Sequence, residues 1–120
     1  AASLLLGADG LVPGLANVAP ALFVALRHAA AFSDVAACVR LQGEIADLWT
    51  LHHQGHWLAA LKAACAIIGL GTGLPAVPLA PASAAQRQAI AAILQRYVPG
   101  VALAGAPGAG TGLRAPARNW

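Results

Sequence analysis

Apolar side chains recur three and four residues apart along most of this chain, which is the spacing of amphipathic helices. We expect the end of one helix and then four further helices, over about residues 1–6, 18–31, 33–52, 58–68 and 83–98. The third of these segments carries a stripe at helical spacing, formed by Val35, Cys38, Gln42, Ile45, Trp49 and His52. This stripe predicts one helix face packed on a neighbour.

Local residue types indicate where the helices begin. Asn17 is expected to cap the helix that starts near residue 18, with Pro20 in its first turn. Ser33 is expected to be the N-cap of the next helix. Ser83 and Gln86 have the spacing of a capping box before the last helix.

Between the first two helical segments lies one short candidate strand. Gly7 and Gly10 indicate a tight turn, and the apolar segment Leu11–Gly14 is typical of a short buried strand. A strand followed by a helix is one βα unit of a parallel α/β protein. Because one such unit cannot form a fold, we expect most of the fold to lie outside this chain.

The composition supports the same expectation. Hydrophobic residues make up 59% of the chain and charged residues only 9%, whereas roughly a quarter of a typical soluble domain is charged. A small domain needs more polar surface than a large one, so we expect other protein to cover these apolar faces. The sequence also lacks methionine, and we therefore expect it to be part of a longer product.

The charged residues and the cysteines argue against three classes of function: membrane spanning, nucleic-acid binding and metal binding. Arg27 and Lys62 interrupt the two longest apolar runs, so neither is predicted to span a membrane. The net charge of +3 comes from scattered basic residues, which argues against nucleic-acid binding. Cys38 and Cys65 lack metal-ligand spacing and are expected to be small buried thiols in a reducing, cytoplasmic setting.

Five segments, in order, resemble one enzyme family. Residues 7–18 closely resemble the last barrel strand of the dihydrodipicolinate synthase / N-acetylneuraminate lyase family. The other four segments are Leu41–Gln42, Ala60–Ala64 with Gly69–Leu70, Leu74–Pro81 without the family's usual arginine, and Ala89–Leu94. The resemblance covers about residues 1–98 and concerns the C-terminal part of the family only.

The resemblance implies an α/β fold of the TIM-barrel family, in which this chain itself is mainly helical. Residues 1–32 would be the last strand of a (β/α)8 barrel and its helix. Residues 33–98 would form the C-terminal helical domain. Residues 99–120 are rich in Gly, Ala and Pro, and we expect them to form a flexible tail.

The resemblance also implies a reaction class. Members are class I aldolases or related lyases that bind pyruvate or another 2-oxo acid as a Schiff base on a barrel lysine. That lysine and its assisting tyrosine lie on earlier strands, and Lys62 matches a lysine of the helical domain instead. We therefore expect a fragment that is inactive alone, with no catalytic residue, no cofactor and no metal of its own.

Residues at the C-terminal end of a barrel strand line the active site. By resemblance these are Val12, Pro13 and Gly14, and the main-chain carbonyl of Val12 would face the pocket. Pro13 stands where relatives often carry a small or hydroxyl residue, and it offers no N–H or hydroxyl for a polar contact. The alternative that all three residues are barrel core stays open.

Other candidate sites receive structural interpretations. His52, His53 and His56 are expected to form a polar loop, because Gly55 intervenes and no carboxylate lies between them. The segment Gly69–Gly73 follows a helix and indicates a C-cap and turn rather than a phosphate loop.

Five further residues are given structural roles in the same way. Asp9 is expected in a turn, and Glu44 and Asp47 on a solvated helix face. Trp49 and Trp57 are expected to be packing anchors.

The expected partners follow from the family. A small 2-oxo acid would bind only in the full-length parent, and neither nucleic acid nor a membrane is expected. The chain would form a homo-oligomer or join a missing barrel partner. A second hypothesis, from another class, is a free-standing helical module for interaction or assembly without catalysis.

Overall fold

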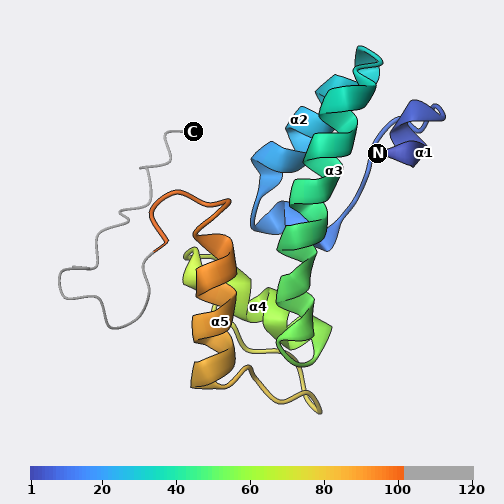
Figure 1. Ribbon diagram of the computed structural model, residues 1–120. Helices are drawn as coiled ribbons and strands as arrows, with labels where there is room; N and C mark the ends of the chain where they lie inside the picture. The colour runs from blue at the N-terminus through green and yellow to red at the C-terminus, as the bar shows by residue number, and fades with distance from the viewer. Residues whose placement is uncertain (102–120) are drawn as a thin grey trace, which may run out of the picture.

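The computed structural model describes residues 1–101, and every regular element in that range is helical (Figure 1). The α-helices are α1 (Ala2–Leu5), α2 (Pro20–Ala31), α3 (Val35–Trp49), α4 (Trp57–Ile67) and α5 (Ala84–Leu94). Two 3-10 helices join them, η1 (Gly14–Asn17) and η2 (Thr50–His53). The predicted order of helices is therefore confirmed, with boundaries that differ by a few residues.

The strand predicted at Leu11–Gly14 is not formed. Pro13 has extended backbone angles, φ −82° and ψ 138°, but Gly14 already begins η1. A strand needs a neighbour to pair with its N–H and C=O groups, and no segment within residues 1–101 supplies one. At Pro13 the backbone therefore has the conformation of a β-strand, but within residues 1–101 it belongs to no sheet.

A three-residue link, residues 32–34, joins α2 and α3 into a helical hairpin (Figure 1). Ser33 has φ +55°, and its N–H donates to the Ala30 carbonyl at 3.0 Å, while the Asp34 N–H donates to the Ala29 carbonyl at 2.9 Å. This pair of bonds is a Schellman motif, in which Ser33 takes the place usually given to glycine. The N-cap of α3 is therefore Asp34, which accepts from the Ala37 N–H at 3.0 Å, and the prediction of Ser33 was wrong.

The cap predicted for α2 was also wrong. Ala19 is the N-cap, and the Asn17 side chain instead donates from Nδ2 to the Gly14 carbonyl at 2.9 Å. The turn of η1 accounts for this, because it places two residues between Asn17 and the helix. Pro20 does occupy the first turn of α2, as predicted.

The buried face of α3 is rotated from the predicted stripe. Its buried residues are Cys38, Leu41, Ile45 and Leu48, whereas Val35 and Trp49 are exposed. Both sets have helical spacing, and the observed one buries two leucines in place of Gln42 and Trp49. The first core cluster forms here, where Leu4 of α1 and Leu26 of α2 meet the buried face of α3.

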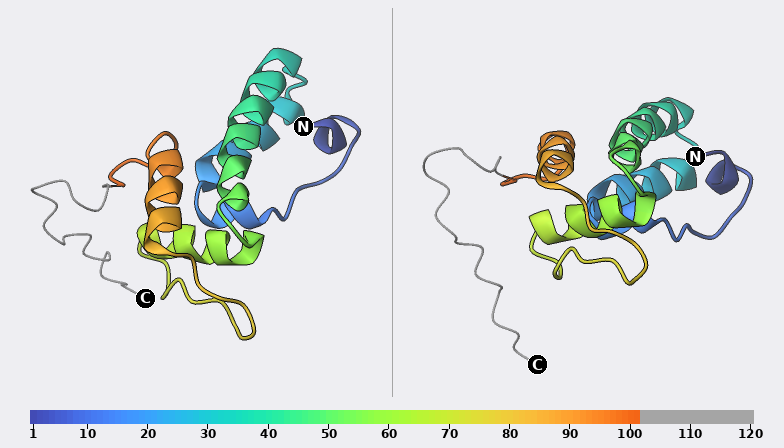
Figure 2. Two further views of the ribbon diagram at one scale, coloured as in Figure 1. Left: turned by 60° about the horizontal axis from the view of Figure 1, so that its bottom comes forward. Right: turned by 90° about the horizontal axis from the view of Figure 1, so that it is seen from below.

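The larger core cluster lies around α4, which crosses below α3 and packs against α5 (Figure 2). Ala60, Ala63 and Ala64 are fully buried. Ile90 and Leu94 of α5 are fully buried in the same cluster. Small side chains on α4 let its neighbours approach closely, and the leucines and isoleucines fill the remaining space.

Two local predictions at helix ends are confirmed. The capping box of α5 is present: Ser83 Oγ accepts from the Gln86 N–H at 3.3 Å, and Gln86 Oε1 accepts from the Ser83 N–H at 2.8 Å. Gly69 ends α4 with φ +86°. The Leu70 N–H then donates to the Cys65 carbonyl at 2.7 Å, as in a Schellman motif.

Exposed apolar side chains concentrate in the first third of the chain. Within residues 1–101, thirteen large apolar residues are exposed, and eight of them precede residue 40. These eight are Leu5, Leu6, Leu11, Val12, Val24, Phe32, Val35 and Val39. The helices after residue 40 have a well-covered core, whereas the elements before it do not cover their own apolar surface.

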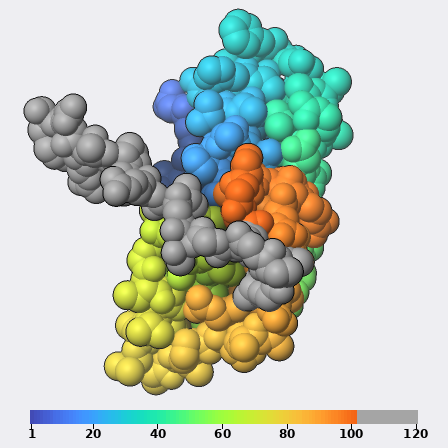
Figure 3. Space-filling view, turned by 90° about the vertical axis from the view of Figure 1, so that its left-hand side faces the viewer, coloured from blue at the N-terminus to red at the C-terminus, as the bar shows by residue number. Residues whose placement is uncertain are grey.

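The C-terminal end of the described chain lies beside α5 (Figure 3). Tyr97, Val98 and Val101 pack against the larger core cluster. Residues 102–120, the main part of the predicted flexible tail, lie outside the described residues. The predicted domain boundary between residues 32 and 33 stays a prediction.

The N-cap of α3 gives a direct stability test. Asp34→Ala removes an acceptor from the first turn of α3 and should lower the free energy of unfolding by about 1 kcal/mol. Urea unfolding followed by circular dichroism measures the change. Asp9→Ala is the matched control, because the Asp9 side chain makes no hydrogen bond within residues 1–101, and an equal loss in both variants would contradict the capping role.

Candidate functional site

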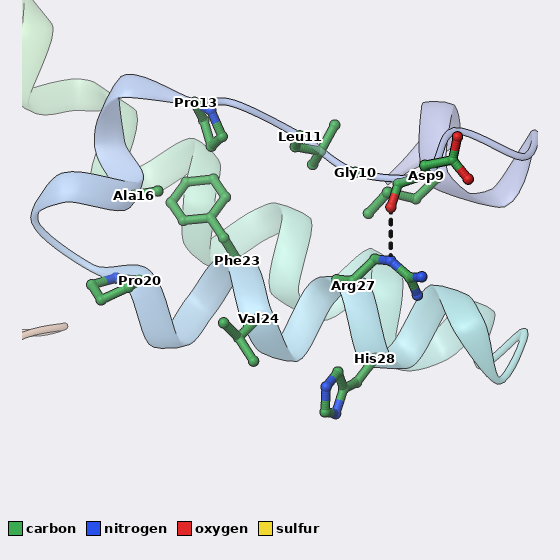
Figure 4. A pocket seen from close by; sticks show the side chains of 11 residues that line it. Asp9, Gly10, Leu11, Pro13, Ala16, Pro20, Phe23, Val24, Arg27 and His28 are labelled. Atoms are coloured by element: carbon green, nitrogen blue, oxygen red, sulfur yellow. Dashed lines mark hydrogen bonds between the residues drawn. The ribbon is translucent and has the colours of Figure 1, made fainter.

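A hollow of about 430 Å³ lies between the extended segment and α2 (Figure 4). Asp9, Gly10, Leu11 and Pro13 line one side of it. The other side is α2, from which Phe23 and Arg27 rise toward the segment. The wall is mainly apolar, with a single guanidinium group at one end.

Arg27 ties the extended segment to α2. Its Nε donates to the main-chain carbonyl of Asp9 at 3.1 Å (Figure 4). The Asp9 carboxylate makes no ion pair within the described range, so the contact depends on the backbone rather than on opposite charges. This bond fixes the start of the segment that leads to Val12, Pro13 and Gly14.

The three predicted site residues lie in different surroundings. Val12 is fully exposed and does not line the hollow, whereas Pro13 is half-buried and does. Gly14 turns toward α4, where a Cβ atom on it would lie 3.1 Å from Leu61 Cδ2. The structure therefore brings only Pro13 into the hollow, and the substrate-binding role of the three residues stays a prediction.

Lys62 lies in α4, away from this hollow. Its side chain is exposed, and within residues 1–101 no carboxylate forms an ion pair with it. It lines a separate hollow together with Asn17 and Thr72. The sequence predicted that Lys62 lies in a helix, and its position in α4 confirms this.

The histidines after α3 have structural contacts. His52 is buried, with Nδ1 3.2 Å from the Trp57 carbonyl oxygen. His56 is the N-cap of α4, and its Nδ1 accepts from the Leu58 N–H at 3.2 Å. Among the residues that the structure describes, no three His, Cys, Asp or Glu side chains are grouped to hold a metal ion.

Trp49 and Trp57 flank His52 edge-on, with ring centroids 4.4 Å and 6.3 Å from the imidazole. Both rings therefore pack against a buried side chain, as the prediction of packing anchors required, although they are themselves 55% and 56% exposed. Each covers the histidine while its own outer surface stays in solvent. Cys38 and Cys65 are both free thiols, the first buried and the second half-buried.

One polar contact was missed by the sequence interpretation. Asp47 was expected on a solvated face, but its Oδ2 accepts from the Tyr97 hydroxyl at 2.5 Å and pairs with Arg96 Nη1 at 2.7 Å. These bonds tie the segment that follows α5 to α3, and Tyr97 and Asp47 are 50 residues apart in the sequence. A local sequence pattern cannot predict a contact between residues so far apart in the sequence.

The environment of Tyr97 changes its acidity. Partial burial, followed by the hydrogen bond to Asp47 and the negative charge of that carboxylate, raises the pKa of Tyr97 to about 12 from an ordinary value of 10.0. All three causes favour the neutral phenol, because the charged form would lose water and face a carboxylate.

Comparison with known families identifies the class. The profile of the Dihydrodipicolinate synthetase family matches residues 1–97. The chain belongs to this family, whose fold is a TIM barrel. Membership of the family suggests a class I aldolase-like lyase. No curated protein and no solved structure matches the chain.

Within residues 1–101, no helix is both long enough and apolar enough to cross a membrane.

The Tyr97–Asp47 bond predicts a pH dependence that can be measured directly. Tyr97 is the only tyrosine in the chain, so its ultraviolet absorption reports its ionisation alone. Its titration should have a midpoint near pH 12 and should move toward 10 in Asp47→Asn. A raised pKa means that the neutral phenol stabilises the fold, so this stability should be full below about pH 10 and lost as the pH rises through 12.

Asp34→Asn is the control for that titration, because it removes a carboxylate that does not contact Tyr97. An unchanged midpoint in Asp47→Asn would show that the hydrogen bond does not determine the acidity.

Proposed function

We propose that this chain is the closing part of a Schiff-base-forming class I aldolase or lyase that acts on pyruvate or another 2-oxo acid. In this proposal the chain contributes the last βα unit and the helical domain. Val12, Pro13 and Gly14 form part of the wall of the substrate pocket. Family membership over residues 1–97 supports the reaction class.

The extended segment before η1 is the main structural support for the proposal that the chain contributes a barrel strand. Pro13 has strand angles, yet the Leu11 and Val12 side chains are exposed and the backbone has no ladder partner within residues 1–101. A strand buried on both faces is the expected setting for such an apolar run in a parallel barrel. Neighbouring strands would therefore satisfy both the backbone and the side chains.

The position of Lys62 supports the proposal that the catalytic lysine does not lie in this chain. A Schiff-base lysine needs a desolvated amine at the mouth of a barrel strand. Lys62 is exposed in the middle of α4, and it is the only lysine of the sequence. The amine that attacks the oxo acid would then come from an earlier strand.

The first test concerns covalent chemistry. The chain alone should incorporate no pyruvate when it is treated with pyruvate and borohydride, because the Lys62 side chain is exposed to solvent and does not lie in a desolvated pocket at the mouth of a strand. Intact-protein mass spectrometry measures the incorporation. A pyruvate adduct on Lys62 would overturn the claim that the catalytic lysine lies elsewhere.

The second test concerns the place of the extended segment. The chain should associate with a separately expressed piece of a family member that holds the first seven βα units, and Val12→Asp should weaken this association at least tenfold. A carboxylate at a fully buried strand position would have to be desolvated. Co-purification and light scattering measure the complex.

Val77→Asp is the matched control, because Val77 is equally exposed but lies in the loop before α5. If both variants bind equally well, the segment is not a barrel strand. Association without any gain of lyase activity would instead favour the second hypothesis, a helical module that uses its exposed apolar residues for assembly.

A further inference from the structure

A second hollow, of about 340 Å³, separates α4 from the loop that follows it. Its wall is formed by Asn17 of η1, by Leu58, Leu61, Lys62 and Cys65 of α4, and by loop residues 70–74. This volume is at the small end of the range for ligand pockets in proteins. Pro13 does not line it, so it is distinct from the hollow against α2.

Two glycines hold the loop side of this hollow in place. Gly71 and Gly73 have φ of +82° and +79°, a region that other residues rarely adopt. Gly73 is buried, and a Cβ atom on it would lie 2.9 Å from the Ala66 Cβ. At Gly73 the loop therefore contacts α4 directly, and the path of the loop depends on glycine at this position.

The charge on the wall is positive and uncompensated. Lys62 is the only charged residue that lines the hollow, and within residues 1–101 it forms no ion pair. The guanidinium of Arg87 lies behind the loop, with Nη1 3.3 Å from the place where a Gly73 Cβ would be. The acidic residues of the chain lie elsewhere, at Asp9, Asp34, Glu44 and Asp47.

Two uncharged polar side chains also line the hollow: the Asn17 carboxamide, whose Nδ2 donates to the Gly14 carbonyl, and the Thr72 hydroxyl. Thr72 Oγ1 accepts from the Leu74 N–H at 3.3 Å, which fixes the oxygen and leaves the hydroxyl proton free to donate. Four of the ten residues that line the hollow are leucines. The site thus combines an ammonium group and a hydroxyl donor with an aliphatic surface.

Cys65 indicates that binding here is not covalent. Burial raises the pKa of the Cys65 thiol, and the positive charge of Lys62 only partly opposes this effect. The thiol therefore stays protonated at neutral pH and is a weak nucleophile.

We propose that this hollow binds a small carboxylate with a branched aliphatic body. The carboxylate would accept hydrogen bonds from the Lys62 ammonium and the Thr72 hydroxyl, as charge-assisted bonds of this kind are the strong ones. The aliphatic body would lie against the leucines of α4 and the loop. The proposal does not depend on the Schiff-base function, because none of its residues belongs to that site.

The test uses the whole chain with isovalerate as the probe and Cys65 as the reporter. Isovalerate should slow the alkylation of Cys65 by iodoacetamide in a saturable way at mildly alkaline pH, because it fills the hollow beside the thiol. Lys62→Met should weaken this protection about tenfold or more, since it removes the charge and keeps most of the apolar stem. Peptide mass spectrometry measures both cysteines in one sample.

Three controls separate the proposal from simpler explanations. Arg40→Met removes a positive charge from the exposed side of α3 and should leave the protection unchanged. Isovaleramide has the same shape without the charge, and acetate has the charge without the aliphatic body, so both should protect poorly. Cys38 is fully buried and should react slowly in every sample unless the fold is lost.

Several outcomes would overturn the proposal. Protection by isovaleramide equal to that by isovalerate would show an apolar hollow without carboxylate recognition. Equal protection in the Lys62→Met chain, with Cys38 still unreactive, would show that the lysine does not bind the ligand. Absence of any saturable protection in the unchanged chain would show that the hollow binds no carboxylate of this type.

Discussion

The described structure depends on one constraint, the close approach that the alanine face of α4 permits. Ala60, Ala63 and Ala64 are fully buried at the centre of the larger core cluster. Leu15 and Val18 reach this cluster from one side, and Leu48, Ile90 and Leu94 reach it from the others. A larger side chain on that face would force α4 and α5 apart, because packed interiors hold little spare volume.

The N-terminal elements show the opposite condition. Leu4, Leu26 and the buried face of α3 form a small cluster, while Leu6, Val12 and Phe32 remain exposed. Apolar surface of this kind is typical of a face that meets other protein. The contrast between the two halves explains the composition: the excess of apolar residues belongs to surfaces that the described residues do not cover.

Sequence patterns predicted most of the helices, because helical spacing and caps act over a few residues. The capping box at Ser83 and Gln86 is local and was predicted correctly. Ser33 was misassigned because the same residue types serve at helix starts and in left-handed turns, and only the bonds to Ala29 and Ala30 distinguish the two. The contact of Asp47 with Tyr97 joins residues far apart in sequence, which no local pattern can reveal. Val12, Pro13 and Gly14 were predicted from family resemblance, and of these three only Pro13 lines the hollow against α2.

The short link between α2 and α3, residues 32–34, has a mechanical consequence. Two hydrogen bonds close the end of α2 at Ser33, and Asp34 immediately opens α3, so no slack remains between the helices. A hinge needs residues whose dihedral angles can change freely, and here each is held by a bond. We therefore expect α2 and α3 to change orientation together, so that a displacement of α3 would also move the helix that follows the extended segment.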